Sequence, residues 1–322
     1  MLYLNTKHIE TLGIDWNETV SVIENAVQNL EQGKFAQPVK PYLRFNDPVN
    51  RIIAMPAYID GDYEAAGIKW IASFPKNIQQ GIQRAHSVTV LNEATTGKPF
   101  ATFNTAIVSG IRTASVSGLM IREFEKVREL KDIKLGIIGF GPIGQLHLQM
   151  AGQLLGDKIK SIALYDINGI KTELIPEQLR AKVKVVKSYE EAYLDADVFI
   201  TCTVSPAGYI DKKPKDGALL LNVSLRDFKP EILDYTGSLI VDDWEEVCRE
   251  KTDIEYMHLE RGLQEEDTRS IADVVVRGAI KDFPQQEAVL FNPMGMAIFD
   301  VAVAVYFYRL AQARNVGVQL EE

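Results

Sequence analysis

The chain has 322 residues, of which 46% are hydrophobic and 25% are charged, and its formal net charge is −9. This composition is typical of an ordinary globular protein rather than a disordered or fibrous one, and the acidic balance argues against nucleic acid as the main partner. The length predicts two domains, and the only two cysteines, Cys202 and Cys248, lie outside any CxxC pair, which argues against a disulfide framework and against a metal site.

The first residues, MLYLNTKHIE, lack the basic segment and apolar run of a secretory signal. No stretch reaches the roughly 18 uncharged apolar residues that a membrane span requires. We therefore expect a cytoplasmic protein without a membrane partner.

The first third of the chain predicts a domain that mixes helices and antiparallel strands. Apolar residues at i, i+3, i+4 spacing predict a helix over about 17–32, which Gly33 would end. Four β-like runs, separated by turn-prone stretches, then follow at 51–58, 66–71, 87–91 and 100–103. Helical patterning resumes from about 105 to 125.

Basic residues are concentrated between Lys34 and Arg112. This segment holds nine Lys and Arg against five Asp and Glu, so it carries +4, whereas the rest of the chain carries −13. Such a segment is either solvated surface or the lining of a pocket for an anionic small molecule, and charge alone does not separate the two.

The pattern changes at Lys134. Short apolar runs alternate with helix-length segments and lie at 135–139, 161–166, 183–186, 197–204, 218–224 and 238–243. This alternation predicts an α/β fold with a Rossmann-type, doubly wound parallel sheet. The apolar segment 296–313 predicts a helix that packs back on the first domain. We therefore expect a Rossmann domain over 119–299 and an α+β substrate-binding and dimerisation domain over 1–118 and 300–322.

A glycine-rich motif stands between the first of these strands and a predicted helix over 145–155. The motif comprises Gly139, Phe140, Gly141, Pro142, Ile143 and Gly144. Gly139 permits a tight turn, Gly141 lets the main chain approach a pyrophosphate, and Gly144 allows close packing of helix and strand. The amides and dipole at the helix N-terminus would then bind the phosphates. A purely structural glycine turn is the alternative.

Asp166 ends the next strand, 22 positions beyond Gly144. The dinucleotide-binding fingerprint places an acidic residue about 20 positions on, where it accepts hydrogen bonds from the adenosine ribose. Its charge would repel a 2′-phosphate, so NAD is expected rather than NADP.

Thr201, Cys202 and Thr203 end a later strand of the same sheet. Ligands of doubly wound sheets lie beyond the carboxyl ends of the strands, so these residues either line the nicotinamide side of the cofactor or serve only in packing. For Cys202 we favour a small buried side chain over a nucleophile.

Taken together, the chain resembles the ornithine cyclodeaminase/μ-crystallin family over essentially its whole length. The motifs that carry the resemblance are PYLRF (41–45), GIKWI (67–71), RAHSVTVLN (84–92), SGIRTASVS (109–117), GFGPIGQ (139–145), LNVSLRD (221–227) and NPMGMAIFD (292–300). The resemblance implies an NAD-dependent oxidoreductase acting on the CH–NH bond of an amino acid, and a homodimer formed through the domain that does not bind the nucleotide.

Within the family, KPYLR, RIIAMP, GIKWIAS, IVDDW and NPMGMAI resemble the branch that oxidises N-(2-amino-2-carboxyethyl)-L-glutamate. Its products, 2-oxoglutarate and L-2,3-diaminopropionate, imply a role in siderophore biosynthesis. Asp227 lacks the Gly-Gly before it and the Gly-Lys after it of typical cyclodeaminases, and Asn292-Pro293 replaces their Asp-Ser, which puts ornithine cyclisation in doubt. Ornithine cyclodeaminase, alanine dehydrogenase and ketimine reductase remain alternative enzymes, and a non-catalytic NAD(H)-binding, crystallin-like protein is the alternative class.

The resemblance also implies where the chemistry lies. Lys69 and Asp227 match catalytic positions, although the sequence does not say which is the base. The expected substrate-binding residues are Lys40, Arg44, Arg51, His86 and Arg112. Such a set suits a substrate with three carboxylates, because guanidinium groups bind carboxylates in a bidentate manner. Without the resemblance, Lys69 would be interpreted as a strand lysine with its amine at the surface, and Asp227 as a loop or helix-cap carboxylate.

Overall fold

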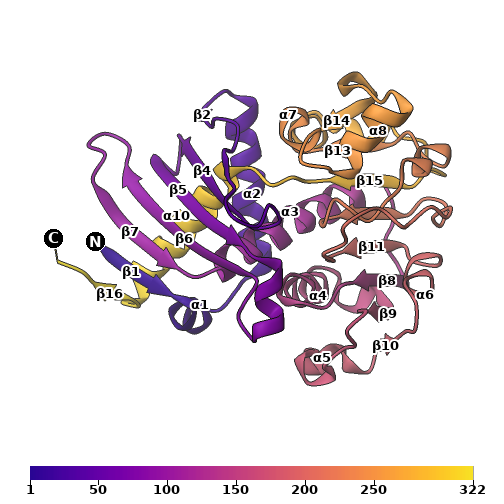
Figure 1. The fold of residues 1–322 in the computed structure, drawn as a ribbon, viewed down its shortest axis with the longest axis horizontal. Helices are drawn as coiled ribbons and strands as arrows, with labels where there is room; N and C mark the ends of the chain where they lie inside the picture. The colour runs from indigo at the N-terminus through magenta and orange to yellow at the C-terminus, as the bar shows by residue number, and fades with distance from the viewer. Residues whose placement is uncertain (322) are drawn as a thin grey trace. The chain divides into compact units, whose positions relative to one another are not determined.

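The computed structural model describes residues 1–321, which divide into two compact units (Figure 1). Unit 1 comprises Met1–Arg112 and the segment from Gly295 onward, and unit 2 comprises Thr113–Met294. The joints thus lie at 112/113 and 294/295, whereas 118/119 and 299/300 were expected. Helix α3 (Ile107–Glu125) runs through the first joint, so no loop or composition change marks it in the sequence.

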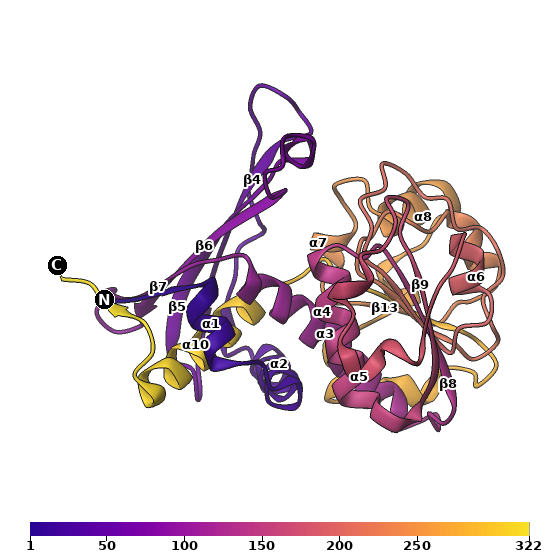
Figure 2. The ribbon, with the colours of Figure 1, turned by 90° about the horizontal axis from the view of Figure 1, so that it is seen from below.

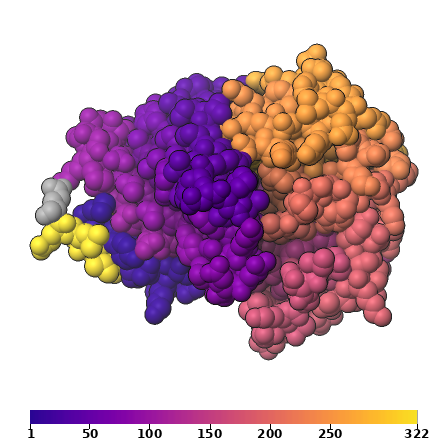
Figure 3. Space-filling view, in the orientation of Figure 1, coloured from indigo at the N-terminus to yellow at the C-terminus, as the bar shows by residue number. Residues whose placement is uncertain are grey.

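Unit 1 contains a mostly antiparallel sheet in the order β16-β1-β7-β6-β5-β4-β2, with β3 paired to β4. Its strands are β1 (Leu2–Asn5), β2 (Phe35–Ala36), β3 (Tyr42–Leu43), β4 (Arg51–Ile59), β5 (Ala65–Ser73), β6 (Ala85–Glu93), β7 (Pro99–Asn104) and β16 (Val318–Gln319). The four β-like runs form β4 to β7 as predicted. The short strands β1, β2, β3 and β16 were not predicted, since two to four residues show no alternation. Of these, β1 pairs parallel to β7 and antiparallel to β16, so the first and the last strand lie side by side (Figure 3).

Helices cover one face of this sheet. They are α1 (Thr6–Leu12), α2 (Trp16–Glu31) and α10 (Ala297–Arg314), while the 3-10 turn η1 (Pro75–Gln80) lies in the connection between β5 and β6. Helix α10 packs on β4, β5 and β6 and on α2 (Figure 2). Every residue from Ala297 to Val305 is buried, which explains why this helix is apolar around its whole circumference. No helix in residues 1–321 has the length and hydropathy to cross a membrane.

Unit 2 contains a parallel sheet in the order β10-β9-β8-β11-β12-β15-β13-β14, which confirms the predicted doubly wound fold. Its strands are β8 (Ile133–Ile138), β9 (Ile159–Tyr165), β10 (Val183–Val185), β11 (Val198–Thr201), β12 (Leu219–Asn222), β13 (Leu239–Val241), β14 (Thr268–Ser270) and β15 (Val289–Asn292). The chain proceeds outward from β8 through β9 to β10 and then returns to β11 on the other side of β8. Loops after β8 and β11 therefore meet at a topological switch point, where ligands of such sheets bind.

Strands β14 and β15 were not predicted. Strand β15 is buried along its length and lies between β12 and β13. Its four residues merge in sequence with the NPMG motif that follows. The helices of unit 2 besides α3 are α4 (Pro142–Leu155), α5 (Glu177–Arg180), α6 (Tyr189–Tyr193), α7 (Trp244–Val247), α8 (Asp253–Arg261) and α9 (Ile271–Val275). Short 3-10 turns lie at Gly156–Lys158, Thr172–Leu174, Pro230–Asp234, Glu265–Asp267 and Ala279–Asp282.

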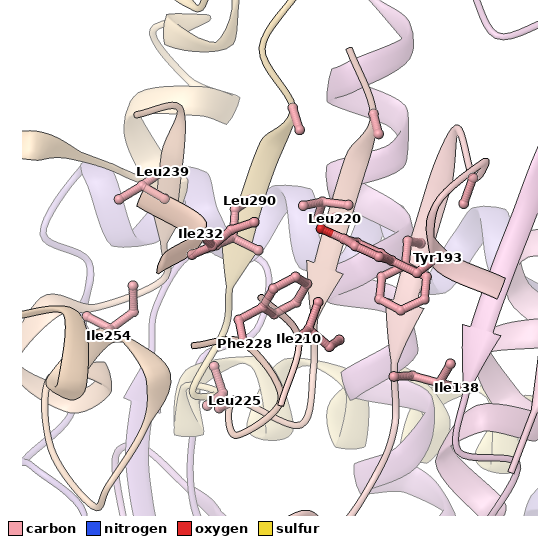
Figure 4. Packing of buried hydrophobic residues seen from close by; sticks show 14 of the residues in the cluster. Ile138, Tyr193, Ile210, Leu220, Leu225, Phe228, Ile232, Leu239, Ile254 and Leu290 are labelled. Carbon is pink, nitrogen blue, oxygen red and sulfur yellow. The ribbon is translucent and has the colours of Figure 1, made fainter. Parts of the chain in front are cut away.

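A cluster of buried side chains on one side of this sheet anchors the loop that follows β12 (Figure 4). Phe228 packs edge-to-face against Tyr193 and Phe199, with ring centroids 6.1 and 6.4 Å apart. Burial of such a ring stabilises the fold by roughly 1.5–3 kcal/mol. Because Phe228 directly follows Asp227, this packing fixes the position of that carboxylate.

Candidate functional site

The glycine turn of unit 2 joins β8 to α4. Gly139 has φ +83°, and a Cβ there would lie 2.4 Å from the carbonyl oxygen of Cys202. A Cβ at Gly144 would lie 2.0 Å from the carbonyl oxygen of Gly139. Both positions therefore exclude any larger residue, because the clashing atoms belong to the main chain.

Gly141 differs from these two glycines, because no atom lies within 4 Å of a Cβ built there. Gly141 is the N-cap of α4, and no side chain caps the helix. The amides of Ile143 and Gly144 in the first turn of α4 therefore have no side-chain cap, and the positive end of the helix dipole lies at the same place. A diphosphate fits this arrangement. The rest of the main chain of the turn is formed by Phe140, Pro142 and Ile143.

Asp166 lies beside this turn at the end of β9. Its Oδ2 accepts a hydrogen bond from the Phe140 amide at 2.7 Å, and its Oδ1 accepts one from the Asn168 amide at 2.8 Å. The carboxylate is thus fixed next to the turn and keeps lone pairs for further donors. The residues after β8 and β9 together fit the diphosphate and ribose of a dinucleotide.

The three residues at the end of β11 have different surroundings. Thr201 is buried and donates to Asn222 Oδ1 at 3.2 Å, whereas Thr203 donates to Asp227 Oδ1 at 2.5 Å. Burial and the nearby Asp227 raise the pKa of the Cys202 thiol, so it stays protonated at neutral pH and is a poor nucleophile.

Within residues 1–321, no group of three or more His, Cys, Asp or Glu side chains is arranged to hold a metal ion.

Asp227 is completely buried and is bound by neutral donors. Thr203 donates to Oδ1 and Ser224 to Oδ2. The Tyr209 hydroxyl also contacts this carboxylate, and burial and Asp227 together raise the pKa of that phenol. Hydroxyl groups can donate or accept, so they can serve both the carboxylate and the carboxylic acid.

Asp253, at the start of α8, holds the main chain around Asp227. Its Oδ2 accepts from the amides of Asp227 at 3.1 Å and Phe228 at 3.0 Å. Its own amide donates to the Leu225 carbonyl at 2.8 Å, where Leu225 has φ +62°. Burial raises the pKa of Asp253 to about 7. Sequence reasoning missed this residue, because nothing local distinguishes it from an ordinary acidic residue in a first helical turn.

Unit 1 brings three of the predicted cations close together, and two of them contact one carboxylate. Lys69 Nζ lies 2.9 Å from Asp300 Oδ1 and 3.1 Å from Ser109 Oγ, and Arg112 Nε lies 3.0 Å from the same Asp300 oxygen. Lys40 donates to the carbonyl of Gly295 at 2.7 Å. Burial, and then repulsion by Arg112, lower the pKa of Lys69 to about 7 despite the opposing effect of Asp300.

Asp300 is a residue that sequence reasoning missed. It lies in the buried apolar run of α10 and is 2% exposed. A single carboxylate in such a run was the available signal, because burying an unpaired charge is strongly unfavourable. The motif NPMGMAIFD (292–300) ends on this residue, whereas the substrate prediction uses only its first two positions.

The remaining predicted residues of unit 1 lie elsewhere. The guanidinium groups of Arg44 and Arg51 lie over the ring of Tyr42, 5.5 and 5.7 Å from its centroid. His86 is exposed and is paired in register with Ala72, so strand alternation places its side chain on the opposite face from Lys69. The structure therefore brings together Lys40, Lys69 and Arg112 but not His86.

These features define a class of protein. A doubly wound sheet with a glycine turn and a positioned acid is combined in one chain with a second unit that buries a cationic cluster. The chain belongs to the ornithine cyclodeaminase/mu-crystallin family, whose sequence profile matches residues 4–315.

Individual relatives are similar along nearly the whole chain. N-((2S)-2-amino-2-carboxyethyl)-L-glutamate dehydrogenase of Staphylococcus aureus is 34% identical, with 99% of this chain and 98% of that protein covered. Alanine dehydrogenase of Archaeoglobus fulgidus is 26% identical, with 99% and 98% covered. The structure of Thermococcus litoralis Delta(1)-pyrroline-2-carboxylate reductase, in complex with NADH and L-proline, has a TM-score of 0.85 and 25% identity, with 99% of this chain and 100% of that chain covered.

Proposed function

We propose that the protein is an NAD-dependent dehydrogenase that cleaves N-(2-amino-2-carboxyethyl)-L-glutamate to 2-oxoglutarate and L-2,3-diaminopropionate. The observation that carries this proposal is the 34% identity, over 99% of the chain, to a Staphylococcus aureus enzyme named for that substrate. We propose that the 2,3-diaminopropionate formed serves siderophore-type biosynthesis and that the enzyme acts in the cytoplasm.

The cofactor half of the proposal rests on unit 2. The open space at Gly141 and the uncapped N-terminus of α4 accommodate a diphosphate. Asp166 is fixed where a ribose hydroxyl would donate to it, and a 2′-phosphate would be repelled. When bound, NAD would accept a hydride, while Cys202 and Thr203 would line its nicotinamide side.

The substrate half rests on the cationic cluster of unit 1. Among residues 1–321, the cations Lys40, Lys69 and Arg112 outnumber the carboxylate that acts on Lys69, which is Asp300. An excess of buried positive charge favours an anionic ligand, and the proposed substrate has three carboxylates. Arg44 and Arg51, both stacked on Tyr42, are proposed to bind a further carboxylate. We leave His86 out of this set, because its side chain lies on the other face of the sheet.

The reaction consumes NAD⁺ and water and yields NADH, one proton and the two products. The bridging amine must lose its proton before the glutamate Cα can release hydride, since only a free lone pair assists that loss. Water then adds to the resulting C=N bond, and the C–N bond breaks. Lys69, with a pKa of about 7, and Asp227, bound by hydroxyls, are proposed to move these protons.

A coupled assay tests this function. Purified protein with NAD⁺ and the glutamate–diaminopropionate conjugate should form NADH, 2-oxoglutarate and 2,3-diaminopropionate in equal amounts, as measured by absorbance and mass spectrometry. Turnover of ornithine, alanine or a cyclic ketimine instead of the conjugate would contradict the substrate and identify another reaction of the family. NAD binding without any turnover would indicate a binding protein.

We also propose a homodimer formed through unit 1. Trp70 and Val88 face each other across β5 and β6 and are 42% and 38% exposed. They lie on the face of the sheet away from α10, since the other face, at Gly67, contacts Val301. Light scattering should give twice the mass of 36.0 kDa, and a monomer would contradict the proposal.

A further inference from the structure

The packing of helix α10 does not require a charged residue at Asp300. Helix α10 packs through apolar side chains, and its residues on both sides of Asp300 are fully buried. One carboxylate oxygen accepts hydrogen bonds from Lys69 and Arg112, whereas Oδ2 is buried without a hydrogen-bond partner within residues 1–321. A buried carboxylate with an unsatisfied oxygen destabilises a fold, so its presence here points to a use in the site.

We propose that Asp300 is a positioning residue, which holds the amine of Lys69 and the guanidinium of Arg112 against one oxygen so that both groups face the substrate in a fixed arrangement. This inference rests on the proposed function. Arg112 reaches Asp300 through Nε, which leaves its two terminal nitrogens to other partners. The pair of terminal nitrogens has the geometry that binds a substrate carboxylate through two parallel hydrogen bonds.

The charged groups that act on Lys69 come from α3, α10 and the segment before β3, and none comes from the paired strands β4 and β6. Arg112 and Ser109 belong to α3, Lys40 precedes β3, and Asp300 belongs to α10. Burial and the two cations favour the neutral amine, and Asp300 is the one group that favours the ammonium. The carboxylate therefore keeps Lys69 able to gain a proton near neutral pH, which a lysine transferring protons in each turnover requires.

Asp300→Asn tests this role, because it removes the charge and preserves the shape. The titration midpoint of the Lys69 amine, measured by NMR of ¹³Cε-labelled lysine, should fall by about one pH unit or more. The reason is that an adjacent opposite charge shifts a pKa by roughly 1–3 units. The acidic limb of kcat/KM should move in the same direction, and KM should rise about tenfold as Arg112 loses its anchor.

Glu123→Gln provides the matched control. Glu123 is also a buried carboxylate with a lysine partner, Lys126 at 2.6 Å, but it belongs to unit 2. This variant should leave the midpoint of Lys69 unchanged. A midpoint in Asp300→Asn that equals that of the unsubstituted protein would overturn the proposal.

Two further results keep the inference separate from other failures. If Asp300→Asn does not fold, the unsubstituted protein labelled at the aspartate carboxyl carbons should show one resonance that shifts with the midpoint of Lys69, and the absence of such a resonance would overturn the pairing. Neither NMR measurement needs substrate. A shifted midpoint in a protein that does not turn over the conjugate would support the role of Asp300 and reject the proposed function.

Discussion

The two units each bury a carboxylate next to proposed reacting groups, but they bind it with different partners. In unit 1, Asp300 is bound by Lys69 and Arg112, which are donors only. In unit 2, Asp227 is bound by the hydroxyls of Thr203 and Ser224, which can reverse their hydrogen bonds. Partners of the first kind suit an anion that stays charged, and partners of the second kind suit a carboxylate that takes up and releases a proton. The comparison favours Asp227 as the proton acceptor and Asp300 as a fixed counter-ion.

The largest effect is expected from neutralising Asp227. Asp227→Asn preserves the shape but cannot accept a proton, so turnover should fall by about 10²–10⁴-fold. The affinity for NAD, measured by calorimetry, should change little, because the glycine turn is unaltered. Asp216→Asn, at an exposed ion pair of the same unit, is the control and should behave as the unsubstituted protein. Equal loss of turnover and NAD affinity would mean that Asp227 supports the fold rather than the reaction.

Two substitutions in the glycine turn should affect NAD binding and protein stability separately. Gly141→Ala places a methyl group in open space at an ordinary φ of −69°, so it should weaken NAD binding by about tenfold without lowering the melting temperature. Gly144→Ala forces a clash with main-chain atoms and should destabilise the protein by roughly 1–3 kcal/mol.

Gly237→Ala, where no atom lies within 4 Å of the added Cβ, is the control for both glycine variants. Unchanged NAD affinity in Gly141→Ala would remove the diphosphate from this turn.

A smaller effect concerns the pH dependence of stability in unit 2. Burial raises the pKa of Asp253 from 3.8 to about 7, so the folded state binds more protons than the unfolded chain between these values. The stability contributed by this group therefore falls as the pH rises from about 4 to 7. Burial lowers the pKa of His147 from 6.5 to about 4, so its contribution rises over nearly the same window.

Substitution should expose the two opposing slopes. Compared with the unsubstituted protein, Asp253→Asn should gain stability on going from pH 5 to pH 7, and His147→Asn should lose it, each by roughly 1–3 kcal/mol in urea unfolding. Slopes of the same sign in both variants would contradict the opposite pKa shifts of these two groups.

The sequence alone determined the features that depend on local geometry. The parallel sheet followed from apolar runs buried on both faces, and the glycine turn followed from its position between a strand and a helix. A backbone that permits only glycine at Gly139 and Gly144 leaves a direct trace in the sequence. The long strands β4 to β7 and helix α2 were predicted for the same reason, since each shows its period over many residues.

Only the tertiary structure decided which side chains meet. Asp300 lies 231 positions from Lys69, and Asp253 lies 26 positions from Asp227, so no spacing rule connects either pair. Strand β15 is too short to show a period and is defined by its neighbours β12 and β13. The side of the sheet on which His86 emerges depends on the register with β5. Charge interactions and strand pairing act through space, and the order of residues along the chain does not encode those distances locally.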